Sequence, residues 1–279
     1  MCIRDRYYDV RVLPAELVPY AALLAEALGS LNTENYSYGD LDKALNLHTG
    51  GFSTFLNTYL ENRRDENLIP KFIVESKATD DKVDKMFELL TEIVNNTIYS
   101  DKDRFKAVLT RHQSRLDANI KQNGFGYART RLFSYFSNEG MFDEMTGGVE
   151  YYWFVTDLVN NFEDKADQIV SALNETAKML FNKNNLMASV TCIKDDVGKF
   201  NSNLKKFVST QPEGSADYQT WNLKLENKNE GLLAASKVQY VVKGYDFKKL
   251  GYKWDGKMRV LDQILSLSLI HISEPTRPY

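Results

Sequence analysis

The chain has 279 residues, of which 43% are hydrophobic and 12% aromatic, and its formal net charge is −3. This composition is typical of a globular protein with a sizeable core and excludes an intrinsically disordered chain. A weakly acidic balance without clusters of Lys and Arg argues against nucleic acid or an anionic membrane as a partner. No apolar run approaches the roughly 20 residues that a membrane-spanning helix needs.

The first predicted elements are a strand and a helix. Residues 7–12 (YYDVRV) alternate in polarity and include β-branched and aromatic side chains, which predicts a strand. A helix is predicted over residues 15–28, with leucines on one stripe. Pro14 opens this helix and Gly29 marks its C-terminal end.

A second helix and a pair of strands follow. Ser37 has the character of an N-cap, which predicts a helix from there through His48. The Gly50-Gly51 pair ends this helix. Residues 52–60 and 71–76 are then expected to form two paired strands.

The next hundred residues are predicted to be mostly helical. Thr79 or Asp80 is expected to cap one helix, and Ser100 with Asp103 is expected to cap the next. The aromatic-rich stretch 124–181 continues in helices, with a turn at Gly147-Gly148.

The last third of the chain mixes both element types. Residues 186–193 predict a buried strand, 195–207 a helix, and the Pro/Gly/Ser-containing stretch 211–217 a linker. A new strand is expected at 237–242, followed by a helix from Gly256 to Ser266. Because strands and helices are segregated and do not alternate, the predicted class is α+β with an antiparallel sheet packed against helices.

The two ends of the chain have an unusual relationship. One permissible codon choice for residues 1–6 (MCIRDR) is the reverse complement of one for residues 267–272 (LSLIHI), and the string resembles a transposon-end sequencing adapter. We therefore expect residues 1–6 and 267–279 to be adapter-derived and exclude them from the fold predictions. On this hypothesis residues 7–266 are an internal fragment, and Cys192 is its single cysteine, which excludes a disulfide framework within it.

Neither histidine of this fragment has the spacing of a metal ligand. His48 and His112 stand far apart, and neither has a second histidine within a helical turn, as HExxH and HxxEH motifs require. His48 before a Gly-Gly turn is typical of a helix C-terminal cation, and His112 lies on an apolar helical stripe, which favours a half-buried packing role. Cys192 in an apolar strand is interpreted as a small core residue and not as a nucleophile.

Three further motifs are also interpreted structurally. Gly124–Gly126 (GFG) lacks the preceding strand and the third glycine of a phosphate-binding loop. The pairs Asp80-Asp81 and Asp195-Asp196 are typical of helix N-termini, where carboxylates complement the helix dipole. Residues 147–154 (GGVEYYWF) could form an aromatic ligand box, but an apolar run that opens a helix more often belongs to a core. No catalytic residue, no metal ligand and no defined substrate-binding residue is therefore predicted.

Three blocks of the sequence resemble one family. Residues 13–53 (beginning LPAELVPY) resemble the start of the C-terminal half of presequence-protease-like enzymes, which belong to the pitrilysin/insulinase family of zinc peptidases. Residues 129–154 (beginning RTRLFSYF) resemble the helical region that follows in that half, and residues 237–266 resemble the opening of the fourth and last domain. The blocks occur in family order.

The resemblance implies a peptidase of two halves that close around a chamber and degrade short unfolded peptides. The zinc of such enzymes is held in the first domain by an HxxEH motif, whose Glu is the general base. The corresponding helix here, 15–28, carries Glu16 and Glu26 but no His, so no zinc role transfers. Zn is expected only in the missing N-terminal half, and the expected partners are that half and peptide substrates. Gly50–Ser53 occupy the position at which the active half presents an edge strand to peptide.

The resemblance also implies a domain division, and two alternatives stay open. Residues 7–195 would be the third, non-catalytic domain, 196–230 a helical linker, and 231–266 the truncated start of the fourth domain. One alternative is a non-catalytic binding or assembly subunit of the same superfamily, for which no HxxEH helix would be encoded upstream. The other is an unrelated α+β interaction domain, which a different sheet order would favour.

Overall fold

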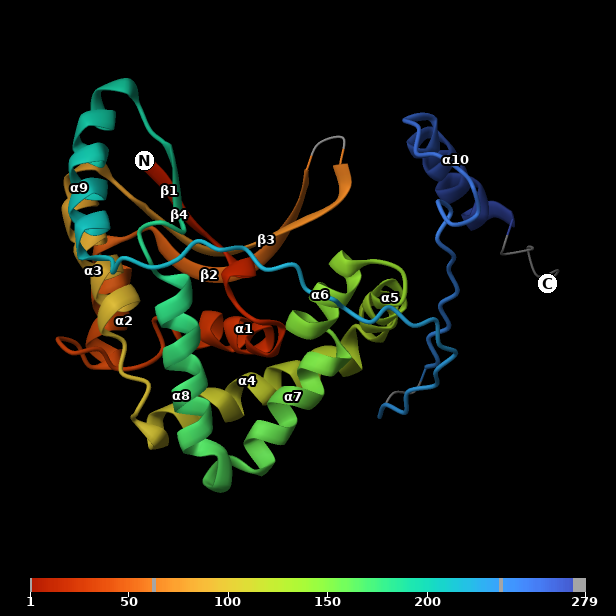
Figure 1. Ribbon diagram of the computed structural model, residues 1–279, viewed down its shortest axis with the longest axis horizontal. Helices are drawn as coiled ribbons and strands as arrows, with labels where there is room; N and C mark the ends of the chain where they lie inside the picture. Colours follow the sequence, from red (N-terminus) through yellow and green to blue (C-terminus); the bar gives the residue numbers. More distant parts are fainter. Residues whose placement is uncertain (1, 62–63, 236–237, 273–279) are drawn as a thin grey trace, which may run out of the picture. The chain divides into compact units, whose positions relative to one another are not determined.

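The structure is a computed structural model that describes residues 2–61, 64–235 and 238–272. It forms two compact units, unit 1 comprising Met1–Val242 and unit 2 comprising Lys243–Tyr279. Unit 1 is an α+β fold in which helices pack against a four-stranded antiparallel sheet (Figure 1), so the predicted fold class is confirmed.

The sheet has the strand order β2-β3-β1-β4. Its bounds are listed together: β1 is Cys2–Asp9, β2 Gly51–Glu61, β3 Arg64–Ala78 and β4 Leu186–Thr191. In the register, Tyr7 of β1 lies opposite Ile73 of β3 on one side and Met187 of β4 on the other. The pairing of β1 with β3 ends at Asp9–Lys71, whereas β2 and β3 remain paired beyond this point as a two-stranded hairpin.

The predicted strand at 7–12 is correct only as far as Asp9. Residues Val10–Val12 form a 3₁₀ turn, because the Asp9 side chain accepts a hydrogen bond from the backbone N–H of Arg11 and caps the turn. The strand also begins earlier than expected, at Cys2. Pairing uses backbone groups that nearly every residue type carries, so the proposed adapter origin of residues 1–6 stays a prediction.

Two other strand predictions were wrong. Residues 186–193 were expected to be buried, but β4 lies at the edge of the sheet and its side chains alternate in exposure, with Met187 53% exposed. In the stretch 237–242, residue 237 lies outside the described residues and residues 238–242 form no strand. A strand forms only against a partner, and no described segment pairs with this one.

One face of the sheet is covered by helices. Those nearest to it are α1 (Val18–Ala27), α2 (Tyr38–His48), α3 (Val83–Asn96), α8 (Phe162–Leu180) and α9 (Val197–Thr210). Their apolar stripes meet the inward-facing strand residues in one core. Tyr8 and Phe72 of the sheet pack edge to face on Phe181, with ring centroids 5.0 and 5.5 Å away.

The predicted helix starts are partly right. Ser37 caps α2 by accepting a hydrogen bond from the N–H of Asp40, and Gly29, with φ of +75°, follows the end of α1, both as expected. In contrast, α3 follows a 3₁₀ turn at Asp80–Lys82 and has no side-chain cap. The cap of the next helix is Asp101 and not Ser100 or Asp103, since the Asp101 carboxylate accepts from the N–H of Arg104.

A second helical layer lies beyond α1. It consists of α4 (Lys102–Gln122), α5 (Gly124–Ser134), α6 (Asn138–Gly147) and α7 (Val149–Asn160), and the turn between α6 and α7 falls at the predicted Gly147-Gly148. Helix α9, which falls largely within the predicted linker 196–230, packs through Phe200 and Phe207 on Phe87 of α3. This helix is therefore part of the core of unit 1.

Unit 2 contains one described helix, α10 (Lys257–Ile272). It begins one residue after the predicted start at Gly256 and continues past Ser266 into the stretch that we expect to be adapter-derived. Among the residues that the structure describes, no helix is long and apolar enough to cross a bilayer.

Candidate functional site

The candidate site is the open face of the sheet, the face opposite the helices. No helix or strand of the described part of unit 1 packs on it, and the side chains that point to it are exposed in the edge strands (Figure 1). Phe55 and Tyr59 of β2 are 39% and 40% exposed, and Met187 of β4 is 53% exposed. A sheet face that displays large apolar side chains to solvent is a candidate contact surface for another chain.

An apolar row crosses this face from edge to edge. The register places Phe55 beside Ile73, Ile73 beside Tyr7, and Tyr7 beside Met187. Ile73 is only 3% exposed although it points to the open face. It lies in the interior of the sheet with a large neighbour on each side, and directly opposed side chains in antiparallel strands are in contact range.

Polar rows lie on both sides of the apolar row. On one side, Ser53, Glu75, Asp5 and Ser189 are paired across the four strands. The hydroxyl of Tyr7 donates to Asp5 at 3.0 Å, and burial, followed by this hydrogen bond, raises the pKa of Tyr7 to about 12.

On the other side of the apolar row, Asn57 lies opposite Lys71, and Lys71 lies opposite Asp9. The open face therefore presents one apolar band between two hydrogen-bonding bands. The strands β2 and β4 leave two sheet edges beside it.

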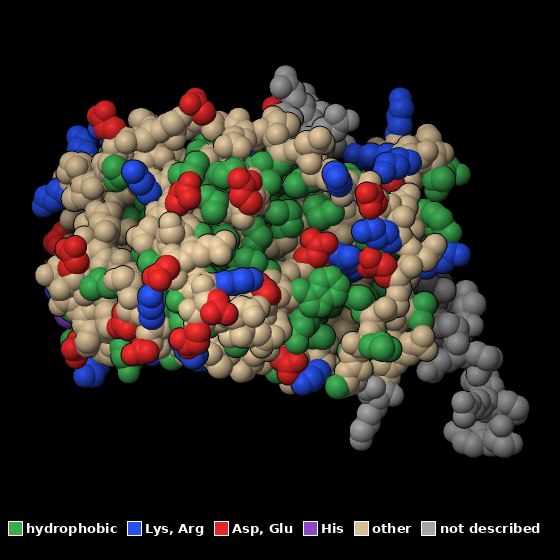
Figure 2. All heavy atoms as spheres, turned by 60° about the horizontal axis from the view of Figure 1, so that its bottom comes forward, with side chains coloured by type: hydrophobic (Ala, Val, Ile, Leu, Met, Phe, Trp, Pro, Cys, Tyr) green, Lys and Arg blue, Asp and Glu red, His purple; other side chains and the backbone are tan. Residues whose placement is uncertain are grey.

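Exposed apolar surface also occurs elsewhere. On the face shown in Figure 2, which views the helical side, hydrophobic side chains gather near the middle with acidic and basic side chains around them. Apolar exposure alone therefore does not identify the site. The open face is distinguished by the ordered row of side chains and by the two sheet edges that border it.

The residues considered from sequence do not assemble into a chemical centre. His48 is the last residue of α2, as expected for a C-terminal cation. His112 of α4 is more buried than predicted, at 5% exposure, and its Nε2 lies 3.0 Å from the hydroxyl of Tyr151. Glu16 is exposed, and Glu26 lies beside His112 and Arg115 at the surface of α4.

The remaining candidates have structural roles. Cys192 follows β4 and is half-buried, so the core interpretation was too strong. The stretch 147–154 opens α7 and buries Val149 and Tyr151, as the core interpretation predicts, although Trp153 is 47% exposed. The pairs Asp80-Asp81 and Asp195-Asp196 lie in the 3₁₀ turns that precede α3 and α9.

The two glycines of the GFG motif have steric explanations that sequence alone does not supply. Gly124 is the first residue of α5, and a Cβ there would fall 2.5 Å from the ring of Tyr240. A Cβ at Gly126 would meet the side chain of Asn123, which caps α5 by accepting from the N–H of Gly126. The motif therefore serves a helix cap and a close contact.

The described residues do not fit a zinc site. Within the described ranges, no three His, Cys, Asp or Glu side chains lie together in an arrangement that could hold a metal ion. No catalytic step through a metal is therefore derived for this chain.

Comparison with protein families identifies the chain. The family model for the region described as peptidase M-16C associated matches residues 5–158. The chain belongs to this peptidase-associated family. The match covers the sheet strands β1 to β3 and the helices through most of α7, so the open face lies mainly in the part that defines the family.

Relatives of this peptidase-associated chain are much longer proteins. Protein HypA of Clostridium perfringens is 33% identical over 264 residues, which cover 95% of this chain and 27% of HypA. The chloroplastic/mitochondrial presequence protease 1 of Arabidopsis thaliana is 25% identical, with 93% of this chain and 24% of that protein covered. The chain thus spans about a quarter of the length of these curated relatives.

A solved structure supports the fold. A conserved protein from Enterococcus faecalis superposes with a TM-score of 0.52 at 16% identity, over 78% of this chain and 49% of that protein. The likeness concerns the α+β architecture alone.

Sequence analysis missed the open face. Phe55, Tyr59 and Met187 lie in stretches predicted as strands, and their alternation shows that two faces exist. The alternation does not tell which face the helices cover. Strand order and helix placement were needed to decide.

Proposed function

We propose that this chain is a non-catalytic wall of a peptidase chamber, contributed by the C-terminal half of a zinc metalloendopeptidase that degrades short unfolded peptides. The single observation that carries the proposal is the open face, with its apolar row Phe55–Ile73–Tyr7–Met187 in a chain of the peptidase-associated family. In this proposal the open face is turned to the chamber and touches the substrate.

The chemistry of the open face suits an unfolded peptide. An extended peptide presents apolar side chains and unpaired backbone groups together, and a band of Phe55 and Met187 between polar rows can contact both. The side chains of the row come from four strands of one sheet, which holds them in fixed positions and lowers the entropic cost of binding. An enclosed wall of this kind also keeps bulk water from the bound peptide.

The proposal assigns the catalytic groups to other parts of the longer protein. Zinc, its ligands and the general base would lie in the N-terminal half, which is the partner of this chain. Residues 7–195 would be the third domain of the enzyme, 196–230 its helical linker, and 231–266 the start of the fourth domain. The relatives that are named presequence proteases support this assignment by their names and by the lengths they extend beyond the match.

Peptide binding to the open face tests the proposal. We would measure the fluorescence anisotropy of a labelled unfolded peptide with the intact chain and with the double variant Phe55→Asp/Met187→Asp. Two charges in the apolar row should weaken binding roughly tenfold or more, since apolar anchors dominate such contacts. The control is Leu47→Asp, at a residue of α2 that is 64% exposed and lies on the helical side.

Two results would count against the proposal. Equal binding by the double variant and the control would remove the open face from substrate contact. Zinc-dependent peptide cleavage by the purified chain, after metal removal and reloading, would show that the chain is itself catalytic. If peptide binds as expected but the gene encodes no HxxEH helix upstream, the chain belongs to a binding or assembly subunit and not to a peptidase.

A further inference from the structure

A long segment without helix or strand runs over the surface of unit 1 after α9 ends. We name residues 212–242 the strap; residues 236 and 237 lie outside its described part. In Figure 1 the strap passes from α9 across the molecule towards α6 and α5. A segment of this length without secondary structure inside a compact unit needs other contacts to hold it.

The first half of the strap is held by backbone and aromatic contacts. The N–H of Gln219 donates to the carbonyl of Arg11 at 2.8 Å, and the indole N–H of Trp221 donates to the carbonyl of Leu13 at 2.9 Å. The Trp221 ring also stacks on Phe142 of α6 at 6.0 Å between centroids. This half is thus bound to elements at both ends of the sequence of unit 1.

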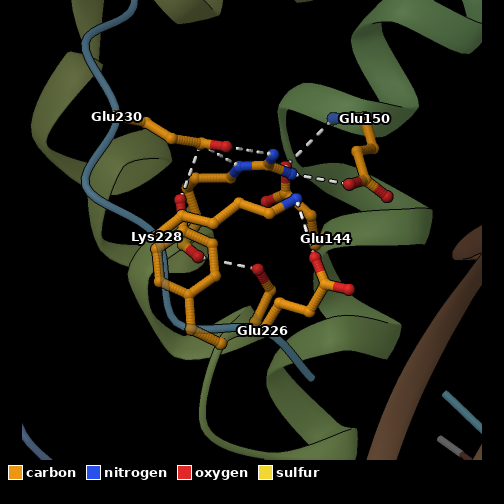
Figure 3. Close-up of polar contacts among 8 residues, drawn as sticks. Glu144, Glu150, Glu226, Lys228 and Glu230 are labelled. Carbon is orange, nitrogen blue, oxygen red and sulfur yellow. Dashed lines mark hydrogen bonds and ion pairs between the residues drawn. The ribbon is translucent and has the colours of Figure 1, made fainter. Parts of the chain in front are cut away.

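The second half is held differently, through one carboxylate. Arg131 of α5 donates from Nε to one oxygen of Glu230 at 2.8 Å and from Nη2 to the other at 3.0 Å (Figure 3). Tyr135, one turn further along the same chain, donates its hydroxyl to Glu230 at 2.6 Å. The residues around Glu230, from 226 to 235, are exposed. Glu230 is therefore the main anchor of this stretch.

The receptor for this carboxylate is fixed independently of Glu230. The remaining guanidinium nitrogen of Arg131, Nη1, donates to Glu150 at 2.6 Å and to Glu144 at 3.3 Å. Glu144 is fully buried and also accepts from the N–H of Glu150 at 3.0 Å. Because these contacts orient the guanidinium, its Nε and Nη2 edge points outward as a ready-made fork for a carboxylate.

We propose that Arg131 and Tyr135 form a carboxylate-binding site whose resident ligand is Glu230, and that this contact is the latch that holds the second half of the strap on unit 1. Release of Glu230 frees the strap after its Trp221 anchor. The latched strap reaches Tyr240, whose ring lies against Gly124 at the start of α5. The latch therefore decides how long a flexible connection leads from unit 1 into the residues that follow.

Limited trypsin digestion of the intact chain tests the latch. Lys224 and Lys228 are exposed residues of the strap on either side of Glu226. Glu230→Gln keeps the shape of the side chain but removes the charge, so cleavage after Lys228 should become about tenfold faster, as expected when a charge-assisted pair is lost. Cleavage after Lys253 in unit 2 provides an internal reference measured by mass spectrometry.

Two further variants make the result specific. Glu226→Gln removes an exposed carboxylate that lies 3.6 Å from Lys228 but does not contact Arg131, and it should leave the cleavage rate unchanged. Tyr135→Phe removes one donor to Glu230 without disturbing the buried Glu144, and its cleavage rate should fall between those of the parent chain and Glu230→Gln. Unchanged cleavage in Glu230→Gln, or equal acceleration in Glu226→Gln, would overturn the latch.

The carboxylate preference of the site has its own test. In Glu230→Ala the fork is vacated, and titration with acetate should shift the NMR signal of the Arg131 Nε–H. The same titration of the parent chain should give a much smaller shift, because an intramolecular ligand competes at an effective concentration in the millimolar range. An Arg131 signal that responds to acetate equally in both proteins, or in neither, would contradict a site occupied by Glu230.

Discussion

The hydroxyl of Tyr151 lies 3.0 Å from Nε2 of His112, and both side chains are buried between α4 and α7. Glu26 of α1 faces the other ring nitrogen at 3.4 Å, and Arg115 lies beside both. Burial lowers the pKa of His112 below its ordinary value; Glu26 acts against this shift, and Arg115 adds to it. The histidine is thus kept neutral where three helices meet.

This relationship predicts that the stability of the protein falls in mild acid. The unfolded chain takes up a proton at the ordinary histidine pKa, about 6.5, whereas the folded chain resists it to lower pH. The free energy of unfolding should therefore decrease as the pH falls below about 6.5, by at most about 1.4 kcal/mol per pH unit from this residue. Urea titrations at several pH values measure this slope.

The two histidines outside the C-terminal stretch provide a matched pair for that experiment. His112→Gln should flatten the slope between about pH 6.5 and pH 5, whereas His48→Gln, at the end of α2, should leave it unchanged. If His112→Gln and the parent chain show the same slope, His112 is not the group responsible.

Arg6 predicts an opposite effect of two arginine substitutions. Its side chain is 1% exposed on the helix-covered face of the sheet, with the guanidinium 4.7 Å from the ring centroid of Phe87 and 5.3 Å from that of Phe207. Burying a guanidinium carries a large desolvation cost, and apolar replacement of buried charges is often stabilising. Arg6→Leu should raise the free energy of unfolding by about 1–2 kcal/mol.

Arg11 is the control. Its guanidinium donates twice to Asp9, at 2.9 and 2.8 Å, and Asp9 is fully buried. Arg11→Leu should therefore lower the free energy of unfolding by about 2 kcal/mol, because a buried carboxylate loses two hydrogen bonds. Thermal unfolding followed by circular dichroism distinguishes the two signs. A loss of stability in Arg6→Leu comparable with that in Arg11→Leu would show that Arg6 is a required part of the core.

The parts of the fold that the sequence predicts well are those with local causes. The N-cap at Ser37 and the glycine at position 29 act within one turn of the helices they delimit, so sequence spacing reveals them. The failures concern partners far away in the chain. Residues 238–242 have the composition of a strand, but a strand exists only when another segment pairs with it.

The candidate site is non-local in the same sense. Tyr7, Ile73 and Met187 are adjacent on the open face because β1 pairs with β3 and β4. No local pattern links these positions. The latch is likewise hidden, because Arg131 and Glu230 are separated by 99 residues.

Phe181 should be a large single contributor to stability. It is 3% exposed, and its ring meets Tyr8 and Phe72, which joins the C-terminal end of α8 to the sheet. Phe181→Ala should lower the free energy of unfolding by about 3–5 kcal/mol, through lost apolar contact and the cavity left behind. Phe125→Ala, at a residue 52% exposed, should change it by less than about 0.5 kcal/mol. Equal effects of the two variants in denaturant titrations would contradict the packing of α8 on the sheet.

Asp9 should control stability in stronger acid. Burial disfavours its charged form, but hydrogen bonds from Arg11 and from Lys71, the latter at 2.7 Å, outweigh burial and hold its pKa below the usual value. A depressed carboxyl pKa in the folded state contributes stability at neutral pH, which is lost as the pH falls below about 4 towards the folded-state pKa. The Asp9 effect is therefore separated in pH from that of His112.

Asp9→Asn tests this assignment. It should reduce the free energy of unfolding at pH 7 by about 3 kcal/mol, because Arg11 and Lys71 lose their buried anion. It should also flatten the dependence of stability on pH below about 4. Asp167→Asn, whose side chain is 89% exposed, should leave both quantities nearly unchanged. An acid limb in Asp9→Asn as steep as that of the parent chain would assign the acid sensitivity to other carboxylates.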